Sequence, residues 1–206
     1  MVKAYHIIFC SYGFWLPNDP RGSWSNFIGA WELLRFGKAT KTQTRQSVAG
    51  HRHDQEMREA AKRKLKYPPV QFTGIQARSI GFGFADFAQI SSLKVLACTI
   101  LPEHVHMVIS RHRYKIEYAI NLLKGAASRK LANDKMHPFA THAKEGERLP
   151  NMWARGQWKV FLDSQEDIER AVRYVEDNPL KEGKSRQTWG FVRPISALSA
   201  PLSGRG

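Results

Sequence analysis

The sequence predicts a single α+β domain built on an antiparallel β-sheet, and three observations support this fold class. Its 206 residues are enough to bury one hydrophobic core without disulfide bonds. Apolar residues make up 42% of the chain, a value typical of globular proteins. Segments with strand composition alternate with segments of helical periodicity, and two strand segments follow each other across a tight turn.

Four segments have the aromatic and β-branched composition that is typical of strands. They are residues 5–11, 94–101, 104–110 and 157–163. Only Pro102-Glu103 separates the second from the third, which indicates an antiparallel pair. The second strand segment is apolar on both faces.

Four segments have the start signals or the periodicity of helices. They are residues 54–65, 74–89, 116–131 and 164–177. Asp54, Thr73 and Ser164 are the expected N-caps, and Asn178-Pro179 is expected to end the last helix. The order of elements is that of a split β-α-β, or ferredoxin-like, fold with the helices on one face of the sheet.

The composition along the chain divides it into a domain and two appendages. We expect one catalytic domain over residues 1–184, with a long loop insertion at about 12–53 that is rich in tryptophan, proline and basic residues. Residues 185–206 are rich in serine, proline and glycine, and we expect a largely disordered tail in which only residues 189–191 dock.

A strong positive charge restricts the class of partner. The chain has 32 Lys and Arg against 18 Asp and Glu, a net charge of +14. Such an excess favours a polyanion, most often nucleic acid, although a basic protein without such a partner remains the alternative. The basic residues expected to contact DNA are Arg21, Arg111, Arg113, Lys115, Lys124, Arg129 and Lys130.

The compartment is indicated by what the sequence contains and lacks. Cys10 and Cys98 lie in apolar runs far apart, so we expect buried free thiols in a reducing environment. The N-terminus runs directly into a strand segment and does not resemble a signal peptide. No apolar run has the length of a membrane span. We therefore expect a cytoplasmic protein.

The most informative short motif is His104-Val105-His106. Side chains alternate between the faces of a strand, so the two histidines point the same way while Val105 and Met107 point into a core. Two imidazoles side by side form half of a divalent-metal site. The alternative is a pair of ordinary histidines on a half-exposed strand.

A second motif lies on the last predicted helix. Tyr174 and Asn178 are four residues apart, so they share one side of the helix. That side borders the buried stripe, where a polar group can face a cleft. The alternative for Tyr174 is an ordinary tyrosine at the edge of the core.

In this order and spacing, the two motifs resemble the single-tyrosine HUH transposases, and most closely the REP-associated tyrosine transposases. The matching stretches are residues 97–108, 122–125, Trp153 and residues 174–183. The resemblance covers residues 5–11 and about 70–184, and it implies the HUH endonuclease type of ferredoxin-like fold. It implies that His104 and His106 bind a divalent metal, Mg²⁺ or Mn²⁺, with Asn178 as a third ligand, and that Tyr174 is the nucleophile.

These observations predict a metal-dependent endonuclease and strand transferase that acts on single-stranded or hairpin DNA through a 5′-phosphotyrosine. A non-catalytic ferredoxin-like module that binds nucleic acid is the main alternative. A zinc hydrolase that uses the histidines is a third possibility, but no nearby glutamate supplies a convincing base. The oligomeric state stays open between a monomer and a homodimer.

Overall fold

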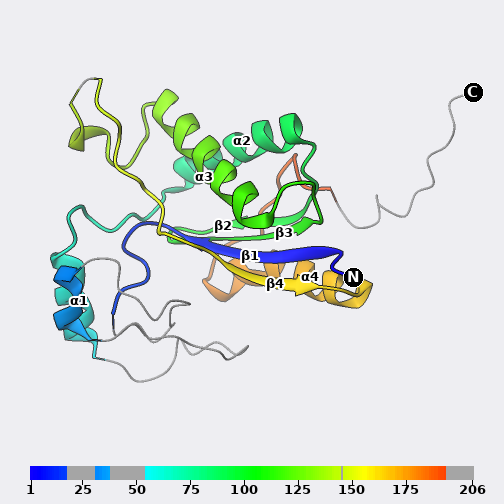
Figure 1. Ribbon diagram of the computed structural model, residues 1–206, viewed down its shortest axis with the longest axis horizontal. Helices are drawn as coiled ribbons and strands as arrows, with labels where there is room; N and C mark the ends of the chain where they lie inside the picture. Colours follow the sequence, from blue (N-terminus) through cyan, green and yellow to red (C-terminus); the bar gives the residue numbers. More distant parts are fainter. Residues whose placement is uncertain (18–30, 38–53, 145, 194–206) are drawn as a thin grey trace, which may run out of the picture.

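The computed structural model describes residues 1–17, 31–37, 54–144 and 146–193 (Figure 1). Its four strands form one antiparallel sheet in the order β2-β3-β1-β4. The strands are β1 (Ala4–Cys10), β2 (Val95–Ile100), β3 (His104–Ser110) and β4 (Trp158–Leu162). Because β3 lies between β1 and β2, the sheet is a split β-α-β arrangement, and the predicted fold class is confirmed.

Four α-helices and two short 3₁₀-helices accompany the sheet in the described residues. The α-helices are α1 (Gln55–Arg63), α2 (Gly74–Ser91), α3 (Ile116–Asn133) and α4 (Gln165–Lys181), and the 3₁₀-helices span Trp31–Phe36 and Ala140–His142. The predicted N-caps are confirmed, since Asp54, Thr73 and Ser164 each accept a hydrogen bond from the backbone three residues on.

The prediction that the helices cover one face of the sheet is wrong. Figure 1 shows α2 and α3 on one side of the sheet and α4 on the other. Phe9 and Met107 pack in the core with α2 and α3, whereas Val108 packs in a second core with Ile168 and Val172 of α4. Because β2 is buried at every residue, both faces of the sheet need a cover, and α4 supplies the second one.

Two glycines that weaken the helix propensity of α2 permit close packing. A Cβ on Gly83 would lie 2.9 Å from the carbonyl oxygen of Ala126, so α3 crosses α2 at this point. A Cβ on Gly81 would lie 2.3 Å from the Trp189 ring, which therefore rests directly on the helix backbone. Close approach explains why a helix tolerates glycine at both positions.

The prediction that Asn178-Pro179 ends the last helix is also wrong, because α4 continues through Pro179 to Lys181. Proline has no N–H, so Val175 loses the hydrogen bond that its carbonyl would accept from residue 179. The hydroxyl of Thr99 on β2 donates to that carbonyl oxygen instead, at 2.7 Å in a buried position. A side chain of the sheet thus compensates for the proline and attaches the end of α4 to β2.

Replacing Thr99 with valine is expected to lower the free energy of unfolding by about 1–3 kcal/mol, because the buried Val175 carbonyl loses its donor. Denaturant titration measures this change. The matched variant Thr99→Ser keeps the hydroxyl and is expected to lose only about 1 kcal/mol, the cost of a buried methyl group. In a Pro179→Ala background the restored N–H can donate to Val175, so Thr99→Val should cost less there. An equal cost in both backgrounds would contradict this account of the helix.

The segment after α4 runs along the outer edge of β2. The Gln187 amide accepts a hydrogen bond from Ile100 N and donates one to Ile100 O, both at 2.8 Å. Farther on, Arg193 N donates to Val95 O at 2.8 Å. The expected docking of residues 189–191 agrees with this arrangement, because Trp189 and Phe191 pack against the core. The expectation of disorder is wrong for residues 185–188 and 192–193, because they too lie along an edge strand. Residues 194–206 lie outside the described residues, as does most of the predicted loop insertion.

Candidate active site

The two histidines of the strand motif lie on the face of β3 that α4 covers. His106 is buried with 4% of its surface exposed, and His104 is half-buried. Val105 and Met107 point to the opposite face and are fully buried in the core beneath α2 and α3. The alternation expected from the sequence is therefore confirmed for this strand.

A third histidine, which the sequence did not suggest, completes the cluster. His6 on β1 is buried, and its Nε2 lies 3.3 Å from Nδ1 of His106, within hydrogen-bond distance. The antiparallel register pairs His6 with Val108 and Ile8 with His106, so the two imidazoles stand on adjacent strands. Burial lowers the pKa of His6 to about 4, and the pKa of His106 falls well below its usual value through burial and the nearby His104, His6 and Lys181.

Tyr174 approaches the histidines from α4 within the same chain, and Asn178 accompanies it one helical turn on. The Tyr174 ring centroid lies 5.7 Å from that of His106 and 5.5 Å from that of His6. Burial raises the pKa of the Tyr174 hydroxyl, while a hydrogen bond with the Asn178 side chain acts in the opposite direction. Asn178 is buried, although Tyr174 keeps 41% of its surface exposed. The nucleophile candidate is therefore accessible at the rim of a polar cluster.

The extension of α4 past Pro179 adds two charged residues to this cluster. Lys181 Nζ lies 4.0 Å from the centroid of the Tyr174 ring, and an oxygen of Glu182 lies 3.8 Å from Nε2 of His104. Their spacing of seven and eight residues from Tyr174 is two helical turns, so they share its side of the helix. The same periodicity in the sequence would have indicated them if the helix had been extended through the proline.

The side chains of His104, His106 and Asn178 are chemically suited to a divalent cation. His6 contacts Nδ1 of His106, so Nε2 is the His106 nitrogen that a metal would take, and metal-binding histidines commonly have an outer partner of this kind. The lowered pKa of His106 favours the neutral imidazole that binds metal. Within the described residues, no group of three or more His, Cys, Asp and Glu is arranged to hold a metal ion.

A small cavity of about 240 Å³ opens beside His104. Gln71, Pro102, Glu103 and Glu182 line the rest of it. His104 is the histidine of the cluster that lines this cavity, and Glu182, which follows α4, lies beside it.

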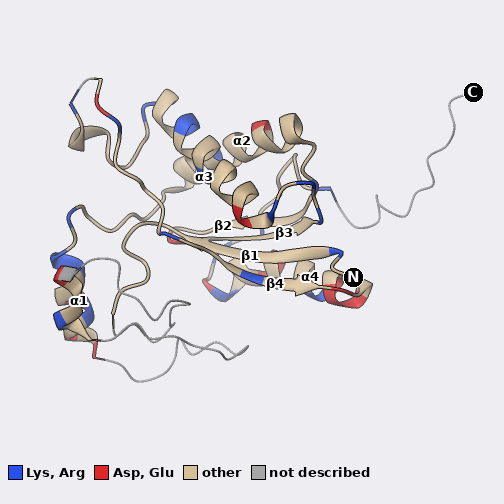
Figure 2. Cartoon of the chain, in the orientation of Figure 1, with Lys and Arg blue, Asp and Glu red and all other residues tan. Residues whose placement is uncertain are grey.

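The basic residues expected to contact DNA fall into different environments. Arg111, Arg113 and Lys115 are exposed on the loop between β3 and α3, and Arg129 is exposed on α3. Figure 2 colours Lys and Arg blue, and it shows such positions on this loop, α3 and α1. Lys130 is half-buried and donates to Asp134 at 2.6 Å, which neutralises its charge locally. Arg21 lies outside the described residues.

Lys124 does not lie on the exposed face of α3, so its placement there from the sequence is wrong. It is buried, and its Nζ donates to the carbonyl oxygens of Ala154 and Gly156 at 3.0 and 2.7 Å. Burial lowers its pKa to about 8. The long side chain reaches from α3 to the segment before β4, so its role is structural.

The lowered pKa of Lys124 predicts that stability rises with pH. Between pH 8 and about 10.5 the unfolded chain keeps the lysine proton that the folded chain has lost, so Lys124 should add roughly 3 kcal/mol to the free energy of unfolding across this window. Above pH 9 the buried Cys98 thiol, whose pKa is raised, acts in the opposite direction, so the contribution of Lys124 is read as the difference between the unmodified protein and Lys124→Met. Lys124→Met should remove this increase, and the exposed Lys94→Met should not. Denaturant titrations at pH 7, 8, 9 and 10 measure the slope. A slope that persists in Lys124→Met would contradict the assignment.

Comparison with protein families shows which family the chain belongs to. A model described as "Transposase IS200 like" matches residues 66–178, more than half of the chain. The chain belongs to the IS200-like transposase family. The matched segment includes His104, His106, Tyr174 and Asn178, whereas His6 lies outside it. The family expected from the sequence motifs is confirmed by this match.

Solved structures of transposases also resemble this family member. One is a REP-associated tyrosine transposase bound to a REP hairpin, at 13% identity and a TM-score of 0.49, covering 99% of this chain and 86% of the other. Another is a candidate transposase from Deinococcus radiodurans R1, at 13% identity and a TM-score of 0.38, covering 90% and 93%. None of the curated proteins compared with the sequence matches it. In the described part of this transposase, no helix is both long and apolar enough to span a membrane.

Proposed function

We propose that this transposase is a metal-dependent single-strand DNA endonuclease and strand transferase that uses Tyr174 as its nucleophile. The observation that carries the proposal is the approach of Tyr174 to His106 and His6 within one chain, with ring centroids less than 6 Å apart. A monomer thus holds all the candidate groups, although a homodimer stays compatible with them. The substrate we propose is hairpin DNA with single-stranded flanks, as the basic surface and the family favour.

His104, His106 and Asn178 would hold the divalent cation. The chemistry supplied by such a cation is withdrawal of charge from a non-bridging phosphate oxygen, which favours in-line attack. Mn²⁺ accepts imidazole nitrogen more readily than Mg²⁺, which prefers oxygen ligands, so Mn²⁺ should support the higher activity. His6 would fix the ring of His106 through their hydrogen bond.

Tyr174 would form the covalent bond. Its raised pKa keeps the phenol protonated at neutral pH, so the proton must leave as the oxygen attacks. Lys181, 4.0 Å from the ring, stabilises the developing negative charge. Attack on phosphorus forms a tyrosine O–P bond and breaks the bond to the 3′-oxygen, which takes up a proton. The products are a 5′-phosphotyrosine and a free 3′-hydroxyl.

The covalent link would conserve the phosphodiester bond for strand transfer. A 3′-hydroxyl of another strand end can attack the same phosphorus, which forms a new phosphodiester and releases Tyr174 without ATP. The exposed Arg111, Arg113, Lys115 and Arg129 would contact the phosphates of the bound DNA. The cytoplasm is the proposed compartment, and it agrees with the burial of Cys10 and Cys98, which form no disulfide bond.

The test is to incubate the protein with end-labelled hairpin DNA that carries single-stranded flanks, with Mn²⁺, with Mg²⁺ or with a chelator. We expect a covalent protein–DNA species on a denaturing gel that depends on the metal, and mass spectrometry of its peptides should locate the DNA on Tyr174. Tight binding without any cleavage product in either metal would instead favour the non-catalytic binding module. Cleavage without a covalent species would favour a hydrolase.

A further inference from the structure

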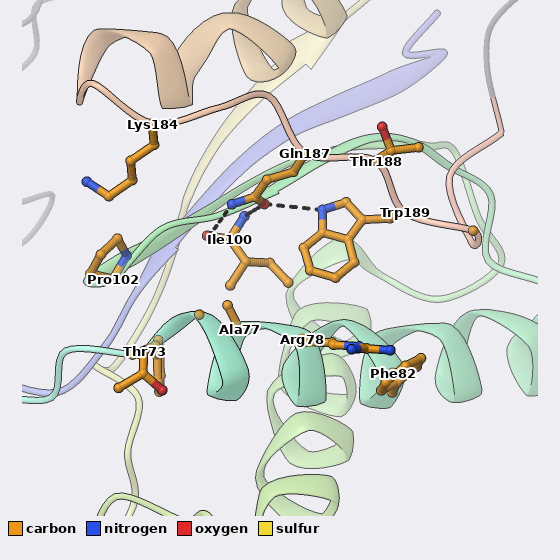
Figure 3. Close-up of a pocket in the computed structure, with 13 residues that line it drawn as sticks. Thr73, Ala77, Arg78, Phe82, Ile100, Pro102, Lys184, Gln187, Thr188 and Trp189 are labelled. Carbon is orange, nitrogen blue, oxygen red and sulfur yellow. Dashed lines mark hydrogen bonds between the residues drawn. The ribbon is translucent and has the colours of Figure 1, made fainter.

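A larger cavity, separate from the one beside His104, lies between α2 and the segment that follows α4 (Figure 3). Its volume is about 540 Å³, within the range of pockets that bind small ligands. Figure 3 shows Ala77, Arg78 and Phe82 on α2 along one wall, and Gln187, Thr188 and Trp189 along the other. Neither the family match nor the proposed chemistry assigns a role to this cavity.

The walls of the cavity offer apolar and aromatic surface that is held in place. Trp189 donates from Nε1 to the Gln187 side chain at 3.2 Å, and its ring rests on Gly81. Gln187 is in turn held by both of its hydrogen bonds to Ile100. Phe72 and Ala77 complete the apolar lining. A fixed aromatic ring beside an apolar wall suits a flat, unsaturated ring such as a nucleobase.

The charged groups of the cavity favour an anion. Lys184 lies at the end near Pro102, and Arg78 extends along α2 over the Phe82 ring at 5.6 Å (Figure 3). None of the described residues that line the cavity is acidic. Lys184 Nζ also lies 3.3 Å from an oxygen of Glu182, which is exposed and can exchange that contact for another anion. An aromatic wall between two cations matches the base and phosphates of a nucleotide.

The cavity adjoins the candidate active site. Pro102 lines both this cavity and the smaller one beside His104. The two cavities are also neighbours along the chain, because Glu182 lines the small cavity and Lys184, two residues later, lines the large one. A DNA strand that reaches His104 can therefore place a neighbouring nucleotide in the larger cavity.

We propose that this cavity binds one unpaired nucleotide of the DNA strand that is presented to the His104–His106 site. The base lies against Trp189 and Ala77, and Lys184 and Arg78 hold its phosphates. This assignment rests on the proposed function for the choice of DNA. It adds a site that would select the substrate by requiring a single-stranded base next to the point of attack.

The experiment uses hairpin DNA with a single-stranded flank in which one base at a time is replaced by an abasic site. Binding is measured by fluorescence anisotropy in the presence of a chelator, so that no cleavage occurs. We expect one abasic position to weaken binding about tenfold, the value of one stacked base. Ala77→Phe, which fills the cavity, should weaken binding of the intact DNA by the same factor and show no further loss with that abasic DNA.

Matched variants distinguish an effect at the cavity from the general effects of an added ring or a lost charge. Gln89→Phe adds the same ring at an exposed position of α2, and it should bind all the DNAs as the unmodified protein does. Arg78→Ala should weaken binding several-fold, and Arg63→Ala, an equal loss of charge on α1, should weaken it less. Circular dichroism establishes that each variant is folded.

The outcomes distinguish this proposal from the proposed function. Equal binding at every abasic position, or unchanged binding by Ala77→Phe, would overturn the cavity assignment, while metal-dependent covalent adducts would still support the nuclease. A single sensitive position without any adduct would support the cavity and reject the nuclease. If a single abasic position weakens binding of RNA but not of DNA with the same sequence, the assignment would also be overturned.

Discussion

Replacement of Tyr174 with phenylalanine is expected to abolish covalent protein–DNA adducts and to leave hairpin binding largely intact. Phenylalanine keeps the ring that contacts His6 and His106 but lacks the oxygen that attacks phosphorus. The substitution removes only one hydrogen bond, to Asn178, from a side chain that is 41% exposed, so the fold should persist. The adduct is measured on a denaturing gel and binding by anisotropy with the same labelled DNA.

A second tyrosine provides the control for this experiment. Tyr118 is 56% exposed and contacts the Tyr114 ring. It lies on α3, on the side of the sheet opposite to α4 and Tyr174. Tyr118→Phe should form adducts at the rate of the unmodified protein. Adducts that persist in Tyr174→Phe would show that another residue is the nucleophile, and the proposed mechanism would be wrong.

Replacement of His106 with glutamine is expected to reduce cleavage by more than about 100-fold. Loss of an outer partner of a metal ligand costs up to about 100-fold, and loss of the ligand itself should cost more. Replacement of His6 with phenylalanine removes such an outer partner, so a loss of about 10–100-fold is expected. Both variants should bind Mn²⁺ more weakly when binding is measured directly by calorimetry. Raising the Mn²⁺ concentration should restore more activity to the His6 variant than to the His106 variant.

The two substitutions should not be additive, because His6 is proposed to act through His106. The double variant is expected to cleave no more slowly than His106→Gln alone. His142, an exposed histidine of the second 3₁₀-helix, supplies a control for the loss of an imidazole elsewhere in the chain. Cleavage at the normal rate by His106→Gln would contradict the metal assignment, and a normal Mn²⁺ affinity of the His6 variant would contradict the role of His6.

Local patterns in the sequence were enough for the secondary structure and for part of the site. The caps at Asp54, Thr73 and Ser164 depend on residues three positions apart, so they are visible in a single sequence. The same is true of the common direction of His104 and His106, because alternation along a strand is local. The predicted order of strands and helices followed from these local signals and agrees with the sheet that forms.

The errors arose where one element depends on another that is distant in the chain. Pro179 would end an isolated helix, but Thr99 on β2 compensates for the missing N–H, so α4 continues to Lys181. The spacing of Lys124 places it on the polar face of α3. The segment before β4 covers it, and Lys124 donates hydrogen bonds to two carbonyl oxygens of that segment. The helices were expected on one face of the sheet, although β2 is apolar on both faces and therefore needs a cover on each, which α4 supplies on the second.

The sequence by itself determined the fold class and the kinds of chemical group available, because strand alternation, helical periodicity and charge are local properties of the chain. Only the tertiary structure decided which of these groups meet. His6 reaches His106 across 100 residues through the register of β1 on β3, and Tyr174 reaches both because α4 covers that face of the sheet. Strand register and the choice of face follow from burying both cores at once, which no local pattern encodes.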